Sequence, residues 1–268
     1  MRKQVFLGCL TGLLCVALLA ACDAASSATE STSNTQPERT VASEITPEEK
    51  QPYEILREKE NETNKIGDEE KQEVELKEAL GKLDFYYQEV EESGDFLMGI
   101  SLQCDKVSND GRSCVLPIIY VFGPSVDPVL CVGFNYIADE YLNVDTIQID
   151  TEKYRYTYDS QTFLQDIQKN SVTVGQIEKT EELAMRLATE DDIDALVDIV
   201  KSDEVTLTFA RYNTAKPEFV ECKMPEEDKQ AITDVLNAYY LYLNASEKFG
   251  QKYLQTFPIQ KVHYKERR

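Results

Sequence analysis

The segment Phe96–Phe122, FLMGISLQCDKVSNDGRSCVLPIIYVF, contains two alternating apolar runs separated by a turn sequence. Every second residue from Phe96 to Cys104 is apolar, and so is every second residue from Cys114 to Phe122. The residues between the runs, SNDG at 108–111, have the composition of a turn, so the segment predicts a β-hairpin. Pro117 has no backbone N–H and predicts a bulge or a sheet edge at that point.

Further strands are predicted on the C-terminal side of this hairpin. Residues 129–136, 144–150 and 153–159 each read as a strand, and a turn at Thr151-Glu152 joins the last two. Sequential hairpins of this kind form an antiparallel meander. A last hairpin is predicted from Val205, Leu207 and Phe209 on one strand and residues 218–223 on the other.

Helical patterns lie before and between the strands. A stripe with helical spacing predicts a helix from about Glu73 to Gly94, made of Leu76, Leu80, Leu83, Tyr87 and Val90. It contains only about two heptads, so we expect it to dock on the domain rather than form a coiled coil.

Two threonines are candidate N-caps of later helices, Thr180 and Thr189, and Asp192 occupies a capping-box position after Thr189. A closing helix is predicted to start at Pro225, with three acidic residues in its first turn. Together the elements predict an α+β fold, an antiparallel β-sheet made of a meander plus a C-terminal hairpin, with helices packed on one face. We expect one such domain at residues 74–258, followed by a basic tail at 259–268.

The N-terminus has the pattern of a secretory signal. Arg2 and Lys3 precede an apolar run at residues 5–19, which is shorter than the ~20 apolar residues that span a bilayer. The run closes with Leu19-Ala20-Ala21-Cys22. This sequence resembles the lipobox of bacterial lipoproteins.

The resemblance implies cleavage of a signal peptide at residues 1–21 and attachment of a diacylglyceryl group to Cys22. Two acyl chains, at ~0.8 kcal/mol per buried methylene, hold a soluble domain on a bilayer. The implied location is the extracytoplasmic face of the bacterial cell membrane. The order hairpin, acidic helix, hairpin and final helix, the last containing DKQAITDVLNAY at 228–239, is loosely similar over residues 143–243 to uncharacterised surface lipoproteins of Gram-positive bacteria. This resemblance has no known active site to carry over.

The charge of the chain excludes some partners. The full sequence has a net charge of −21, and loss of Arg2 and Lys3 leaves 26 basic and 49 acidic residues, a net charge of −23. Such a surface repels phosphate polymers, so nucleic acid is not an expected partner. Residues 22–73 contain few large apolar side chains, and we expect a disordered acidic tether there that starts at the lipidated residue.

Four cysteines remain in the predicted domain, Cys104, Cys114, Cys131 and Cys222. Cys104 and Cys114 close the first hairpin and are a possible disulfide, with four buried thiols as the alternative. No C-x₂-C spacing exists, so no zinc site is predicted.

The sequence carries no recognisable catalytic set and implies no cofactor. Its one histidine, His263, lies in the basic tail, and the serine-nucleophile, P-loop and H-E-x-x-H patterns are absent. A pair of carboxylates defined only by separation in space is not readable from sequence. The acidic run that contains Asp191, Asp192, Asp194 and Asp198 lacks the glycine and the final glutamate of an EF-hand, and reads as a solvated helix face.

Three tyrosines, Tyr154, Tyr156 and Tyr158, alternate along one strand. They are a possible ligand platform for sugar rings if exposed, and part of the core if covered. The resulting expectation is a non-catalytic binding module at the cell envelope, anchored through Cys22. Its partner would be a cell-wall or host-surface ligand, or an envelope protein. The alternative is a carboxylate-dependent envelope hydrolase.

Overall fold

The predicted hairpin is present as strands β2 (Phe96–Ser101) and β3 (Cys114–Phe122), with Phe96 opposite Phe122 and Gly99 opposite Ile119. It lies in the middle of a seven-stranded sheet, sheet A, whose order is β11-β1-β2-β3-β4-β8-β7. The computed structural model describes residues 50–60, 69–88, 96–103, 111–122, 128–249 and 260–261, and the structural statements below concern these residues.

The other strands of sheet A surround this hairpin. They are β1 (Leu83–Gln88), β4 (Val129–Ala138), β7 (Gln168–Val174), β8 (Ile177–Leu187) and β11 (Gln260–Lys261). All neighbours pair antiparallel except β1 and β11, which are parallel. Pro117 lies in an interior strand, but at this position β3 has no described partner on its β2 side, so a local edge is present there as expected. The ladder between β2 and β3 ends at Ile119, and the proline therefore interrupts no pairing with β2.

A second, four-stranded sheet, sheet B, has the order β10-β9-β5-β6. Its strands are β5 (Thr146–Asp150), β6 (Arg155–Asp159), β9 (Thr206–Arg211) and β10 (Glu218–Lys223), and a short 3₁₀ turn, η1 (Ser160–Thr162), follows β6. Both predicted hairpins, β5–β6 and β9–β10, are therefore present, and they join through β5 and β9. One continuous sheet was the expectation, whereas the chain forms two.

Two carboxylates hold the crossing from sheet A to sheet B. Glu182 on β8 accepts the backbone N–H groups of Asn143 and Val144, each at 2.8 Å. Asp145 accepts the N–H groups of Tyr212 and Asn213 at 2.9 and 2.7 Å. Because these bonds fix the chain after β4, the next strand joins β9 instead of continuing the meander.

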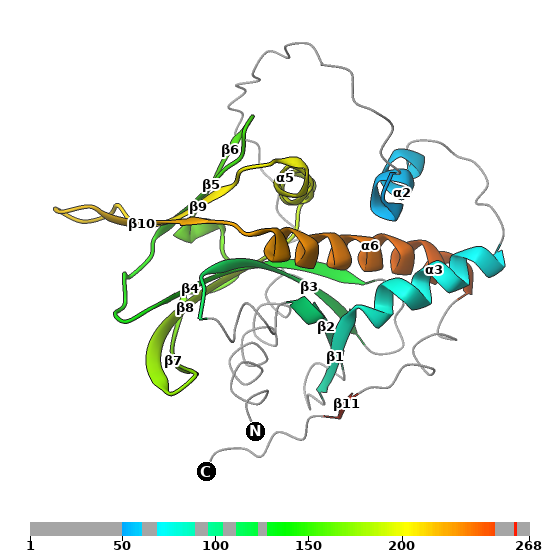
Figure 1. The fold of residues 1–268 in the computed structure, drawn as a ribbon, viewed down its shortest axis with the longest axis horizontal. Coiled ribbons are helices and arrows are strands. Elements are labelled where there is room, and N and C mark those ends of the chain that lie inside the picture. Colours follow the sequence, from blue (N-terminus) through cyan, green and yellow to red (C-terminus); the bar gives the residue numbers. More distant parts are fainter. Residues whose placement is uncertain are drawn as a thin grey trace, which may run out of the picture.

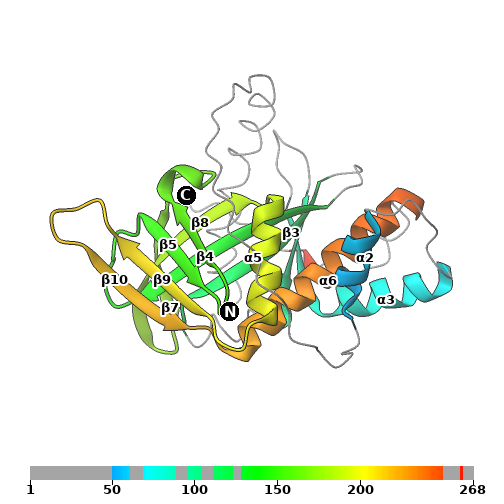
Figure 2. The ribbon, with the colours of Figure 1, turned by 90° about the horizontal axis from the view of Figure 1, so that it is seen from above.

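Four helices lie on one side of sheet A, as Figures 1 and 2 show. They are α2 (Pro52–Glu60), α3 (Glu69–Gly81), α5 (Glu190–Lys201) and α6 (Glu226–Phe249). The long helix α6 packs on β2 and β3 and contacts each of the other three helices. Among the helices that the structure describes, none has the length and hydrophobicity needed to cross a bilayer.

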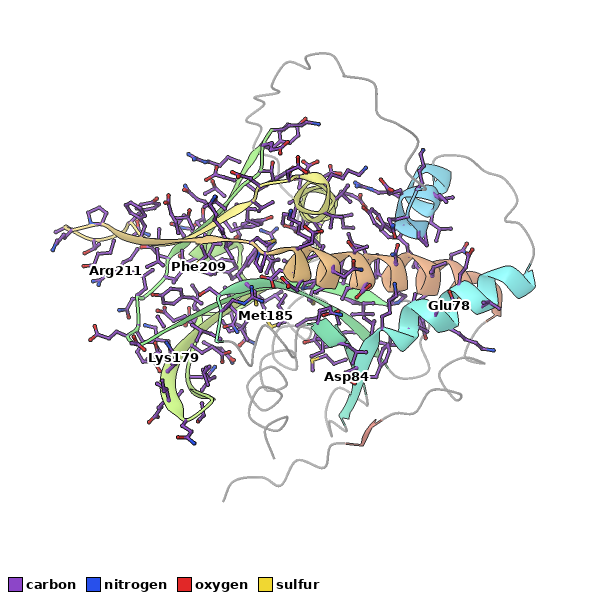
Figure 3. The ribbon with its side chains drawn as sticks, viewed as in Figure 1. Glu78, Asp84, Lys179, Met185, Phe209 and Arg211 are labelled. Carbon is purple, nitrogen blue, oxygen red and sulfur yellow. The ribbon has the colours of Figure 1, made fainter. Side chains whose placement is uncertain are left out.

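The main core lies between sheet A and the layer formed by sheet B and the helices (Figure 3). Aromatic rings join the two sheets, with Phe134 4.7 Å from Tyr158 and Tyr136 5.3 Å from Phe209 between ring centroids. A second set of buried apolar side chains belongs to sheet A but not to this cluster: Met98, Ile100, Leu116, Ile118, Tyr120, Cys131, Leu183 and Met185. Sheet A is therefore apolar on both faces. The α+β fold with antiparallel sheets and packed helices is confirmed.

Two predicted helices are corrected by the structure. The helix expected to end at Gly94 ends at Gly81, and Leu83 and Tyr87 belong to strand β1, where aromatic residues favour the strand. Thr180 is no N-cap, because it lies in β8 and its hydroxyl donates to the Ala138 carbonyl at 3.0 Å. Strand β8 contains good helix formers, but pairing with both β4 and β7 overrides that propensity.

The expected disordered tether is also corrected where the structure describes it. Residues 52–60 form α2, which packs on α6, and α3 begins at Glu69. Tyr53 supplies the apolar contact that composition alone did not reveal, since its side chain is only 1% exposed. The residues between 22 and 49 lie outside the described part of the chain, as does most of the basic tail.

Candidate functional site

Several residues singled out from the sequence fall outside the described ranges. Cys22, the predicted lipidation site, is one of them, and His263 is another. Cys104 also lies outside, whereas Cys114 is buried at the start of β3. The Cys104–Cys114 disulfide therefore stays a prediction. Cys131 is fully buried in β4, and its burial raises the pKa of its thiol.

The three tyrosines do not form a ligand platform. Tyr158 is buried against Phe134, with the Arg186 guanidinium 5.3 Å from its ring centroid. The Tyr156 hydroxyl donates to Asp198 on α5, and burial raises the pKa of both phenols. Only Tyr154, at 47% exposure, is accessible. The core interpretation applies because helix α5 covers this face of sheet B.

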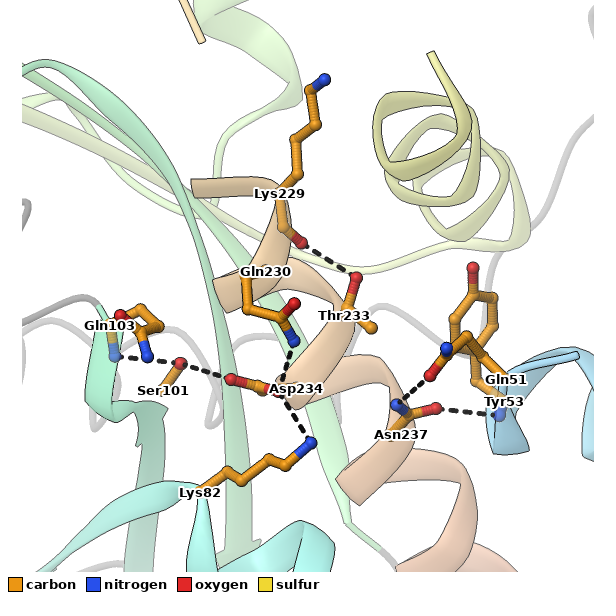
Figure 4. A network of polar contacts seen from close by, with 10 residues as sticks. All are labelled: Gln51, Tyr53, Lys82, Ser101, Gln103, Lys229, Gln230, Thr233, Asp234 and Asn237. Carbon is orange, nitrogen blue, oxygen red and sulfur yellow. Dashed lines mark hydrogen bonds and ion pairs between the residues drawn. The ribbon is translucent and has the colours of Figure 1, made fainter. Parts of the chain in front are cut away.

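A buried polar network joins α6 to its neighbours (Figure 4). The Asp234 carboxylate accepts from Gln230 at 2.9 Å and from the Ser101 hydroxyl of β2 at 3.3 Å. The Lys82 ammonium, between α3 and β1, lies 3.4 Å from the same carboxylate. The site therefore connects a helix, a strand and a turn, and Asp234 acts as a structural anion.

Asn237, one turn further along α6, holds the segment before and at the start of α2 (Figure 4). Its side-chain oxygen accepts the Tyr53 backbone N–H at 3.1 Å, and its amide donates to the Gln51 side chain at 3.2 Å. On the other side of α2, Lys201 of α5 lies 2.6 Å from Glu54, and Arg57 binds Asp194. Helix α2 is therefore fixed to both α5 and α6.

Glu181 is a buried carboxylate on the opposite face of sheet A. It points away from the helices, on the face shared by Asn135 of β4 and Asn170 of β7, whose amides donate to it at 3.0 and 3.2 Å. Burial outweighs these hydrogen bonds and raises the pKa of Glu181. No paired carboxylate accompanies it among these contacts, because the adjacent Glu182 binds the backbone of Asn143 and Val144.

The acidic run of α5 also has structural partners. Asp192 accepts the N–H and the hydroxyl of Thr189, both at 2.8 Å, and lies 3.1 Å from Arg186. Asp194 pairs with Arg57, and Asp198 with Tyr156. Within the described ranges no group of three histidine, cysteine, aspartate or glutamate residues is arranged to hold a metal ion.

Three of the exposed large apolar side chains in the described part of the chain lie on one hairpin. Strand β10 is an edge of sheet B, and Figure 1 shows its hairpin with β9 projecting from the molecule. Phe219 is 60% exposed, Val220 37% and Tyr212 41%. We call Tyr212 together with strand β10 the hairpin edge. Exposed apolar side chains grouped in this way are typical of protein interaction sites.

The main chain of β10 is also open to a partner. The Met224 N–H donates to the Val205 carbonyl at 2.9 Å, so Met224 and every second residue before it face β9. Phe219, Glu221 and Lys223 therefore direct their N–H and C=O groups away from the sheet. A row of such groups is a template for an added strand.

The sequence contained a signal for this surface that the alternation rule did not use. Phe219 and Val220 are adjacent, so they project from opposite faces of one strand, between Glu218 and Glu221. A strand with one buried face accounts for only one of two adjacent apolar residues. An edge strand exposed on both faces explains both.

No protein-family model matches the chain, and no curated protein or solved structure is significantly similar to it.

Proposed function

We propose that the mature chain is a lipid-anchored, extracytoplasmic interaction module of a bacterial cell envelope, without catalytic activity. The hairpin edge is the observation that carries the interaction part of this proposal. It combines exposed aromatic and aliphatic side chains with outward-facing main-chain groups on a projecting strand. Native proteins usually cover or charge their edge strands, and here Phe219 and Val220 leave an exposed apolar segment between the charged residues of β10.

The anchor part of the proposal rests on the sequence from Arg2 to Cys22. A basic start, an apolar run of about 15 residues and Leu19-Ala20-Ala21-Cys22 occur in register. The net charge of −23 after cleavage supports attachment through lipid rather than through charge, because an acidic surface is repelled by anionic headgroups.

The hydrolase alternative receives no support from the buried carboxylates. Asp234, Asp192 and Glu182 are each bound by cations or backbone N–H groups that hold elements together. Glu181 has the raised pKa that a general acid needs, but its described partners are two asparagine amides rather than a second carboxylate.

The anchor is tested by Cys22→Ala in the full-length chain, expressed in a Gram-positive host. We expect the wild-type protein to partition into the detergent phase with a lipid-modified N-terminus. The variant should lack lipid and leave the detergent phase, because the thioether has no acceptor. Continued partition of the variant into detergent would contradict lipidation at Cys22. Cys222→Ser is a matched control and should partition as the wild type does.

A further inference from the structure

We infer that the hairpin edge pairs with the hairpin edge of a second copy of this chain, the two β10 strands running antiparallel about a twofold axis at Cys222. The inference rests on the proposed interaction surface and names its partner. A twofold axis needs a self-complementary surface, and an antiparallel pair of identical strands provides one.

The hydrogen-bond pattern of β10 limits the possible registers. Only Phe219, Glu221 and Lys223 present their main-chain groups outward, so these residues must form the hydrogen-bonded pairs across the interface. A twofold axis can then pass through Val220, Glu221 or Cys222. Axes at Phe219 or Lys223 would leave only one hydrogen-bonded pair within the strand, and axes between two residues would place inward-facing groups opposite outward-facing ones.

Side-chain charge selects among the three registers. An axis at Glu221 places two glutamates directly opposite, which juxtaposes like charges, and an axis at Val220 places each glutamate opposite Phe219 of the second copy, so neither forms an ion pair. An axis at Cys222 places Glu221 opposite Lys223 of the second copy, and symmetry repeats this pair. It also places Val220 opposite Met224 of the second copy. This register alone joins opposite charges at both of its hydrogen-bonded pairs.

The charged side chains of β10 are exposed, so two β10 strands can approach each other. Glu221 is exposed, and the Lys223 side chain is 82% exposed and lies 3.9 Å from Glu204. The edge strand of sheet A, β7, differs from β10: its exposed residues are the polar Lys169, Ser171 and Thr173. Of these two edges, β10 is the one with exposed apolar side chains.

The register makes a specific chemical prediction. Cys222 lies at a non-hydrogen-bonded position, where facing Cα atoms are about 4.5 Å apart, within the range that a disulfide spans. Its thiol is half-buried beside Ser113. Membranes that contain the full-length chain should therefore give a disulfide-linked dimer on non-reducing gels after treatment with the oxidant copper phenanthroline. The variant Cys222→Ser should give no such dimer.

Charge exchange tests the register itself. Glu221→Lys or Lys223→Glu alone turns two attractive pairs into repulsive ones, and we expect roughly a tenfold loss of dimer affinity from each. The double variant Glu221→Lys/Lys223→Glu restores the pairs and should restore the cross-link. Lys153→Glu, an exposed change in the turn between β5 and β6, is the matched control and should leave cross-linking unchanged.

The same charge-exchange variants, tested in solution without the lipid, distinguish a failure of this inference from a failure of the proposed anchor. The chain from residue 22 onward with Cys22→Ser lacks the lipid, and its association is measured by analytical ultracentrifugation at high concentration. A dimer sensitive to charge exchange supports the inference even if Cys22 proves not to be lipidated. A monomer at millimolar concentration, cross-linking through another cysteine, or a dimer insensitive to the single exchanges would overturn it. A cross-linked product with a different protein would also overturn it, although the hairpin edge would remain an interaction surface.

Discussion

Glu181 shows how a single buried acid makes stability depend on pH. Its carboxyl is 1% exposed, and its pKa is raised above the ordinary value of 4.5 by burial, against the two asparagine hydrogen bonds. In the unfolded chain the group ionises near pH 4.5, whereas in the folded chain it ionises at a higher pH. The folded state therefore binds more protons between these two values, and the stability that Glu181 contributes falls as the pH rises through this window.

We predict that Glu181→Gln stabilises the protein at pH 7. The variant keeps a hydrogen-bonding side chain of similar shape but removes the cost of burying a charge. Its advantage should shrink as the pH falls toward 4.5, where the wild-type carboxyl is protonated. Urea unfolding at pH 4.5, 6 and 7.5 measures the difference, with the exposed Glu178→Gln on the same strand as control. A variant less stable than wild type at pH 7.5 would contradict the assignment.

At the scale of elements, α2 is the part whose role depends most on a few contacts. One buried ring, two hydrogen bonds to Asn237 and ion pairs to α5 attach it. Among the described residues, the folded domain therefore extends to Gln51 and does not begin near residue 73.

Tyr53→Ala should detach α2 from the groove between α5 and α6. Removing this buried ring should lower the free energy of unfolding by about 2–4 kcal/mol. The loss is smaller if α2 separates from α5 and α6 before the rest of the domain unfolds. Ile55→Ala, on the same helix but 37% exposed, should change it by less than about 0.5 kcal/mol. Thermal unfolding and hydrogen exchange of residues 52–58 report both effects. Equal losses for the two variants would show that α2 is not held by Tyr53.

Elements with a single clear periodicity were predictable from sequence. The β2–β3 hairpin, helix α5 and helix α6 follow their apolar patterns to within a few residues. Strand β8 was not predictable in this way, since its last eight residues, TEELAMRL, include strong helix formers and its pairing with the two neighbouring strands makes it extended. Helix α2 was missed because its packing on the core rests on Tyr53 and Leu56, too few apolar residues to show a helical stripe in the sequence.

At the scale of the whole molecule, the class of fold was predictable but the division into two sheets was not. That division depends on Glu182 and Asp145, which bind backbone groups far away in sequence. The alternation of the three tyrosines was visible in the sequence, whereas the position of α5 over them was not. The interaction surface depends on which strand lies at an edge, which is a property of sheet order rather than of any local pattern.

The central claim is that the hairpin edge is the surface through which the anchored domain meets its partner. The most direct measurement places the photo-cross-linking residue p-benzoylphenylalanine at position 219 or at position 177 of the full-length chain, in membranes. Phe219 and Ile177 are 60% and 62% exposed, so they differ in location but not in accessibility. We predict a discrete cross-linked product from position 219, with the mass of two chains, and none from position 177. Equal products from both positions, or none from position 219, would contradict the claim.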